Sequence, residues 1–149
     1  MESAETIMQT WMSRVWNQLD AGAIDELLAA DAPVHGLGEA PLIGSAGFRE
    51  FHAGFTGAFS DIQIVVERQV VVGENVAGQW SATMTHKASG TPVTAGGMVI
   101  FSFRDGQIRE GWNAADFLPM LTQLGIVDED AMERAMTPPA QMSSTSAAS

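Results

Sequence analysis

The sequence predicts an α+β fold, a cone-shaped barrel in which a curved, mainly antiparallel sheet wraps around N-terminal helices. Apolar residues recur three or four positions apart through residues 4–59, which is typical of core-facing helices, and at every second position from about residue 62 to 116, which is typical of strands. The turn signals Gly73-Glu74-Asn75 and Asp105-Gly106 join those strands as antiparallel neighbours. Helices followed by a run of strands indicate a layered α+β architecture.

The helical part divides into three helices. The first covers residues 4–19 and ends at Asp20, Ala21 and Gly22, and the second covers residues 23–30, before Pro33. A brief strand over residues 34–37 separates them from a third helix that begins near residue 45. The apolar face of this third helix consists of Phe48, Phe51, Phe55 and Phe59, and His52 shares that face.

Four strands follow, over residues 62–72, 76–86, 95–104 and 107–116. The second strand places His86 on the face that carries Trp80 and Met84. On the fourth strand, Glu110 has the same parity as Trp112. Asn113 has the opposite parity, unless a bulge before the end of the strand turns it inward.

The amino-acid composition limits the kinds of binding partner that we expect for this protein. Seven basic residues against eighteen acidic ones give a net charge of −11, which disfavours nucleic acid and anionic lipid. The chain has no cysteine for a disulfide or a thiolate metal site, and no apolar run of membrane-spanning or signal-peptide length. We therefore expect no nucleic-acid or membrane partner and, by default, a cytoplasmic location.

One domain over residues 1–127 accounts for these elements. Residues 128–149 are predicted to form an acidic helical turn followed by a low-complexity tail that we expect to be disordered. Both faces of the predicted sheet are hydrophobic, which suggests that a second subunit covers the outer face. The residues that indicate this homodimer are Val65, Val71, Val99, Phe101 and Phe103.

Asp116 occupies the junction where the strand pattern changes into a helix pattern. With Trp112 upstream and Phe117 beside it, its carboxylate is expected at the lip of an apolar cavity, an environment that suits acid/base chemistry. The alternative is that Asp116 caps the following helix by accepting backbone N–H groups.

The closing segment WNAADFLPMLTQLG, together with the order of the elements and the strand histidine His86, resembles the SnoaL-like polyketide cyclases, also called ester cyclases. These belong to the nuclear transport factor 2-like superfamily of cone-shaped α+β barrels. The resemblance covers roughly residues 5–125, and its most specific part is the pattern Trp-Asn-x-x-Asp-Phe-Leu followed by Gln-Leu-Gly.

The resemblance implies a role for four residues. In cyclases of this family the acid that opens the terminal segment is the proposed general acid/base of an intramolecular aldol closure, and Asp116 matches it. His86 matches the strand histidine of the family, and His35 matches a polar group after the second helix. Trp16 matches the aromatic residue that shapes the pocket.

Such chemistry requires no cofactor and no metal, because one carboxyl group can remove a proton and later return it. The substrate would be a small apolar carbonyl compound, oriented by an apolar box. His86 or His35 would steady the developing oxyanion, and Glu110 and Asn113 are candidate polar neighbours of Asp116. The predicted box consists of Trp16, Phe51, Phe55, Trp80, Met84, Met98 and Trp112.

Other functions stay open at this point. A hydrolase or dehydratase could use the same pocket, and a non-catalytic module could bind a small ligand or only dimerise. Each histidine has a structural alternative as a hydrogen-bonded core residue. His35, His52 and His86 share no metal-ligand spacing, so we predict no metal site.

Overall fold

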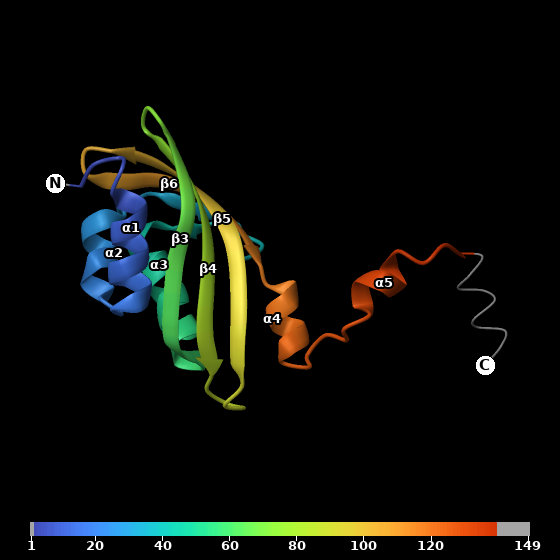
Figure 1. Ribbon diagram of the computed structural model, residues 1–149. Coiled ribbons are helices and arrows are strands. Elements are labelled where there is room, and N and C mark those ends of the chain that lie inside the picture. Colours follow the sequence, from blue (N-terminus) through green and yellow to red (C-terminus); the bar gives the residue numbers. More distant parts are fainter. Residues whose placement is uncertain (1, 140–149) are drawn as a thin grey trace, which may run out of the picture.

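The structure, a computed structural model, describes residues 2–139 and has helices packed against one face of a curved sheet (Figure 1). The helical elements of the N-terminal half are α1 (Ile7–Trp11), a π-helical segment η1 (Met12–Asn17), α2 (Ala21–Leu27) and α3 (Gly44–Ala58). Two short helices follow the sheet, α4 (Leu118–Gln123) and α5 (Ala131–Ala135).

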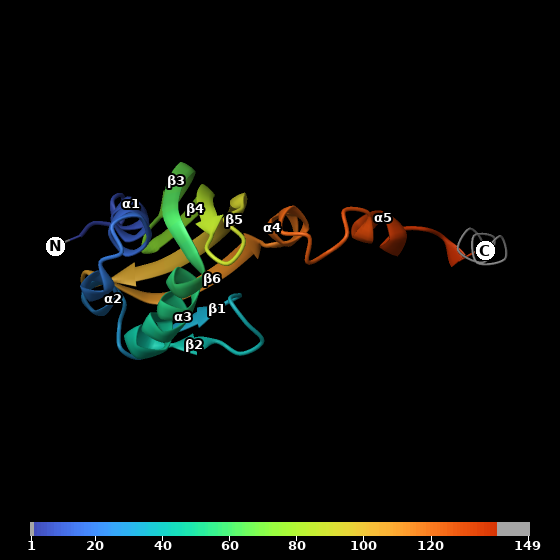
Figure 2. The same ribbon diagram turned by 90° about the horizontal axis from the view of Figure 1, so that it is seen from below.

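The sheet has six strands in the order β2-β1-β6-β5-β4-β3. The strands are β1 (Pro33–His35), β2 (Leu42–Ile43), β3 (Phe59–Val72), β4 (Asn75–His86), β5 (Pro92–Arg104) and β6 (Gln107–Asp116). Strands β3 to β6 form an antiparallel meander, whereas β1 pairs in parallel with β6. The sheet curves around the helices without closing, as Figure 2 shows. The predicted α+β cone is confirmed.

The first helix differs from its prediction because it changes hydrogen-bond pattern after Trp11. The N–H of Gln18 bonds the carbonyl of Ser13 five residues back, at 2.9 Å, which is the spacing of a π-helix. Asp20 then caps α2, its carboxylate accepting the N–H of Ala23. The Arg14 guanidinium bonds the same carboxylate at 2.9 Å and holds the pKa of Asp20 below its ordinary value.

A β-bulge in β6 decides which residues of that strand face the helices. Ser102 of β5 lies opposite Glu110, whereas the next residue, Phe103, lies opposite Ile108, so Arg109 is an extra residue in β6. Ile108 before the bulge is buried, and after it the inward positions are Gly111 and Asn113. The bulge therefore reverses the parity that the sequence pattern predicted for the end of β6.

Aromatic side chains join the helices to the sheet. The ring of Trp11 meets Phe48 of α3 edge-on at a centroid distance of 5.0 Å and Phe101 of β5 at 6.0 Å. Trp16 meets Phe55 edge-on at 5.5 Å. These contacts hold α1, η1 and α3 over one face of the sheet.

Two polar residues fix η1 more specifically. The Asn17 amide forms two hydrogen bonds with the backbone of Ile64 in β3, donating to the carbonyl at 3.0 Å and accepting from the N–H at 2.7 Å. His52 of α3 is buried and its Nε2 lies 2.8 Å from the carbonyl of Val15. Because a carbonyl only accepts, Nε2 carries the proton and donates. His52 is thus a hydrogen-bonded core residue.

After α4 the chain leaves the body of the fold, and α5 lies apart from the sheet (Figures 1 and 2). Within residues 2–139, no helix has the length and apolar character needed to cross a membrane. The tail that the sequence predicts to be disordered lies, from residue 140 onward, outside the described residues.

Asn17→Ala should destabilise the fold by about 1–3 kcal/mol, because it removes two hydrogen bonds and leaves backbone groups of Ile64 without their partner. Urea unfolding followed by tryptophan fluorescence measures the change. Gln9→Ala in α1, where the side chain is exposed, is the control and should change stability little. Equal losses in the two variants would contradict the anchoring role of Asn17.

Candidate functional site

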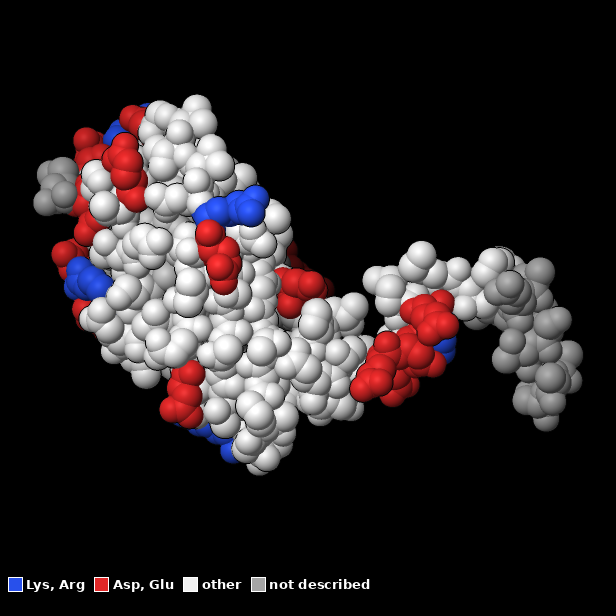
Figure 3. Space-filling view, viewed as in Figure 1, with Lys and Arg blue, Asp and Glu red and all other residues white. Residues whose placement is uncertain are grey.

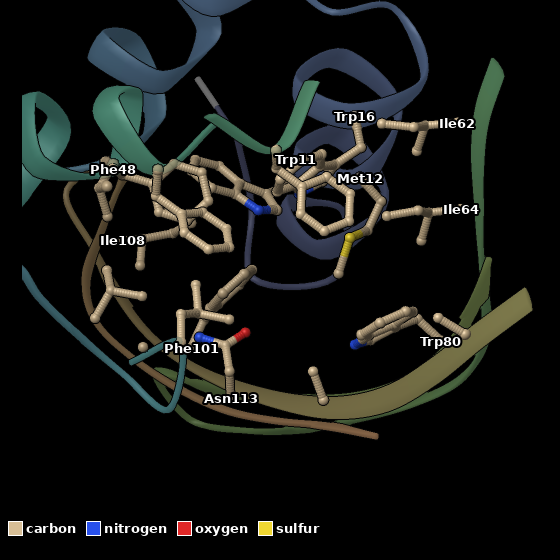
Figure 4. A pocket seen from close by; sticks show the side chains of 18 of the residues that line it. Trp11, Met12, Trp16, Phe48, Ile62, Ile64, Trp80, Phe101, Ile108 and Asn113 are labelled. Carbon is tan, nitrogen blue, oxygen red and sulfur yellow. The ribbon is translucent and has the colours of Figure 1, made fainter. Parts of the chain in front are cut away.

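An apolar cavity lies between the sheet and the helices α1, η1 and α3 (Figure 4). Its wall contains one side chain with a polar amide, Asn113, and no Asp, Glu, His, Lys or Arg from the described part of the chain. The twenty lining residues are Trp11, Met12, Trp16, Leu28, Val34, Leu37, Phe48, Phe51, Phe55, Ile62, Ile64, Trp80, Met84, Ala95, Phe101, Ile108, Gly111, Asn113, Ala115 and Phe117.

The cavity exists because the inward positions at one end of β5 and β6 carry small residues. Ala95 and Gly97 occupy them on β5, and Gly111 and Ala115 on β6. The rings of Trp16, Phe51 and Phe55 line the opposite wall, on η1 and α3. Small side chains opposite large ones therefore leave space that the fold does not fill.

Gly97 determines how the Trp80 ring lies in the cavity. It is directly opposite Trp80 in the β4–β5 ladder, and a Cβ at this position would lie 2.8 Å from Cζ2 of the Trp80 indole. The absence of a side chain lets the indole extend over β5 toward β6. Trp80 therefore projects along the floor of the cavity, as Figure 4 shows.

Asn113 is held by the turn that follows β1. Its Nδ2 donates to the carbonyl of His35 at 3.1 Å. Gly36 makes this approach possible, since its φ is +90° and a Cβ there would lie 1.9 Å from the Asn113 carbonyl oxygen. The amide of Asn113 thus enters the cavity with its nitrogen already bonded.

The structure brings six of the predicted site residues to the cavity. Trp16, Phe51 and Phe55 line it from the helical side, and Trp80, Met84 and Asn113 from the sheet. Asn113 lies inward because of the bulge at Arg109, the alternative that its strand parity had left open.

Three predicted lining residues point to the opposite face of the sheet. Met98 is 61% exposed and Trp112 is 41% exposed, and Glu110 lies on the same outer side. The expected positions of Glu110 and Trp112 are corrected by the bulge in β6. The expected position of Met98 is corrected by cross-strand pairing. Gly97 lies opposite the inward-facing Trp80, so the next residue on β5, Met98, faces outward.

His35 joins this outer group rather than the cavity. Its Nε2 lies 2.8 Å from a carboxylate oxygen of Glu110, and its ring stacks on Trp112 at 5.9 Å with an interplanar angle of 20°. Both members of the His35–Glu110 pair are about one-third exposed. The cluster lies on the face of β1 and β6 that turns away from the helices.

Asp116 is exposed, and its carboxylate lies on the outer side of β6, between the cavity-lining neighbours Ala115 and Phe117. It does not cap the next helix either, because the N-cap position of α4 is Phe117 and no side chain of residues 2–139 bonds the helix start. Neither of the two predicted environments of Asp116 is present in this conformation.

His86 lies at the far end of β4. It has the inward parity that the sequence predicts, but it is not part of the cavity wall. Its Nδ1 lies 2.8 Å from the hydroxyl of Ser89, and its ring packs against Phe59 at 5.3 Å. His86 therefore contacts the β4–β5 turn and the start of β3.

Sequence reasoning missed several lining residues. Trp11 and Met12 lie on the apolar stripe of the first helix and were expected to fill the core, Phe101 was expected to cover the outer face, and Ile108 was given no role. Phe117 lies beside Asp116 in the segment that was singled out. The signal that could have located the cavity is the run of small residues on facing strands, with Ala95 opposite Ala82 and Gly97 opposite the bulky Trp80.

Helices enclosed by a curved, open sheet around one apolar cavity define the cone fold of nuclear transport factor 2-like proteins. The chain belongs to the SnoaL-like polyketide cyclase family, whose model matches residues 6–124. The resemblance seen in the sequence is thereby confirmed. No curated protein sequence matches the chain.

Solved structures share this fold over most of their length. IdmH from Streptomyces antibioticus, whose proposed activity is that of a polyketide cyclase, is 26% identical, with a TM-score of 0.74 over 83% of this chain and 99% of IdmH. TsrD from Streptomyces laurentii is 20% identical, with a TM-score of 0.74 over 85% and 99% of the two chains. A SnoaL-like polyketide cyclase from Agrobacterium tumefaciens is 19% identical, with a TM-score of 0.70 over 84% and 100%.

Gly97→Ala should destabilise the protein by about 1–3 kcal/mol, because the added methyl group meets both the Trp80 ring and the backbone of β6 at less than 3.0 Å. Gly96→Ala is the matched control on the outer face, where the nearest atom is 3.4 Å away. Thermal unfolding of both variants measures the difference. If the two variants melt together, Gly97 does not determine the position of the Trp80 ring.

Proposed function

We propose that this protein binds a flat, largely apolar carbonyl compound in its cavity and promotes a cyclase-type ring closure or isomerisation without a cofactor. The observation that carries the proposal is the cavity wall, which consists of aromatic and aliphatic side chains around one anchored amide. Such a wall suits a planar ring system with few polar groups. Membership of the SnoaL-like cyclase family supports the same chemistry.

Orientation is the contribution that this cavity is best suited to supply. Rings from η1, α3 and β4 restrict a flexible chain to compact conformations in which its ends meet. Holding the reacting carbons in contact contributes up to about 7–11 kcal/mol in well-oriented intramolecular reactions. A ring closure therefore gains rate from the walls of the cavity before any proton is transferred.

The family pattern assigns proton transfer to Asp116, and this role is the part of the proposal that requires movement. The carboxylate lies on the outer side of β6, so the last residues of the strand would have to rotate for it to reach a ligand. The alternative is a protein that binds its ligand without reaction. It is favoured by the fact that Asp116, His35 and His86 all lie outside the cavity wall.

Ala115→Leu should abolish binding of 6-hydroxy-1-tetralone, a flat bicyclic ketone, because the larger side chain enters the cavity. Ala114→Leu is the matched control, since Ala114 is exposed on the opposite face of the same strand. Isothermal titration calorimetry measures the binding of the tetralone by the two variants. Equal binding by the two variants would place the ligand site elsewhere and overturn the proposal.

The catalytic part has its own readout. The diketone 1-phenylhexane-1,5-dione closes to a cyclohexenone by an intramolecular aldol reaction, which chromatography follows. Loss of this turnover in Asp116→Asn, with tetralone binding unchanged, supports proton transfer by Asp116. Binding without turnover in the unaltered protein supports the non-catalytic alternative.

The homodimer predicted from the sequence remains our proposal, now centred on different residues. Val99, Phe101 and Phe103 are buried under the helices, whereas the exposed apolar side chains of the outer face are Val65, Val70, Val72, Met98, Ile100 and Trp112. Figure 3 shows few charged residues on the strand surface in view, while acidic residues gather near α1 and α2 and over α5. Two acidic chains would repel each other least across such a face.

Ile100→Asp should convert the dimer into a monomer, because it places a charge in the middle of this apolar face. Light scattering after size-exclusion chromatography gives the mass. Ala53→Asp on the exposed side of α3 is the control and should leave the mass unchanged. A monomeric mass for the unaltered protein would refute the dimer.

A further inference from the structure

We propose that Asn113 and Trp80 form a polar recognition pair in the cavity. In this pair Asn113 Oδ1 accepts a hydrogen bond from a ligand hydroxyl group, and the Trp80 indole N–H donates one to a ligand carbonyl. The inference rests on the proposed function and narrows its ligand class to flat compounds that carry both a ketone and a hydroxyl group. The two residues are specificity-determining, and neither is assigned a step in catalysis.

The orientation of the Asn113 amide follows from its neighbour. The carbonyl of His35 only accepts hydrogen bonds, so the atom that faces it at 3.1 Å must be the amide nitrogen. The alternative orientation would place two oxygens against each other. Oδ1 is therefore the atom left for the cavity, and it can only accept.

The position of Asn113 is as constrained as its orientation. The backbone of Gly36 contacts the Asn113 carbonyl, and β1 pairs with β6 immediately before this residue. The acceptor thus projects from rigid sheet rather than from a loop. A ligand donor gains a preorganised partner here, and a ligand without a donor would leave the oxygen desolvated and unpaired.

Trp80 supplies the complementary donor. Among the hydrogen bonds of residues 2–139, none uses its indole nitrogen, and the ring lies so close to Gly97 that a Cβ there would be 2.8 Å from its Cζ2 atom. Figure 4 shows the nitrogen of Trp80 turned toward the side of the cavity where Asn113 lies. An indole N–H only donates, so it selects an acceptor such as a ketone oxygen.

The positions of Trp80 and Asn113 on different strands indicate how many polar groups the ligand needs. Trp80 on β4 and Asn113 on β6 are separated by β5 and offset by one inward position, since Trp80 opposes Gly97 and Asn113 opposes Val99. Strand spacing and rise place their Cα atoms roughly 12 Å apart, and the Trp80 side chain covers much of that span. The indole N–H and Asn113 Oδ1 are therefore closer together than the two Cα atoms, and a compound that meets both needs two separate polar groups, an acceptor and a donor, on one ring system.

Three ligands separate the two hydrogen bonds. The reference is 6-hydroxy-1-tetralone; 6-methoxy-1-tetralone cannot donate, and 5,6,7,8-tetrahydro-2-naphthol lacks the ketone. Calorimetry with the unaltered protein should show binding weakened about tenfold for each change, the equivalent of one lost hydrogen bond to a preorganised partner. This series needs no variant and so does not depend on folding of one.

Two variants assign the effects to residues. Asn113→Leu should bind the hydroxy and methoxy ketones equally, and Trp80→Phe should bind the ketone and the naphthol equally, as a double-mutant cycle requires. Each variant should keep its sensitivity to the other change. The methoxy group is larger than the hydroxyl group, and the Asn113→Leu variant controls for its size. A loss of affinity caused by size alone would persist in that variant.

The outcomes are distinct. If the methoxy ketone and the naphthol bind the unaltered protein as tightly as the reference, the recognition pair is refuted while the cavity proposal stands. The same follows if either loss persists in its matched variant. If none of the three ligands binds, the proposed function itself fails.

Discussion

Side chains on a strand alternate between its two faces, and one extra residue in β6 sets that alternation for the whole site. The bulge at Arg109 turns Asn113 and Ala115 toward the helices and leaves Glu110, Trp112 and Asp116 on the outer side. The outward placement of the acid and the inward placement of Asn113 both follow from this one irregularity.

The cavity also shows what the fold leaves unfilled. Empty apolar space lowers stability in proportion to its volume, and replacing Gly111 or Ala115 by something larger is the simplest way to remove it. Here the sheet instead keeps small residues opposite rings on η1 and α3. A cavity wall that leaves such space, and in which the Asn113 nitrogen is already hydrogen-bonded, is suited to ligand binding rather than to maximal packing.

The sequence predicted the fold well because periodicity reports burial directly. The stripe of the first helix, the meander and the junction at Asp116 appear where they were expected, within a few residues. The outward positions of Glu110, Trp112 and Asp116 could not be predicted, since a bulge depends on pairing with β5 that no local pattern at Arg109 reveals. The prediction for Met98 failed for a related reason, because only the pairing of β5 with β4 shows which face of the sheet this residue occupies. The short strand β2 was missed because two residues carry no period.

The extra residue in β6 also limits how functional roles can be carried from one homologue to another. Two related chains place the residues at the end of this strand in the same surroundings only if both contain the bulge residue. Identical amino acids at aligned positions are not sufficient. Loss of one codon at Arg109 would exchange interior and exterior, turning Trp112 and Asp116 inward and expelling Asn113. Lineages that differ at this site can therefore conserve an aspartate by position while using it in opposite surroundings.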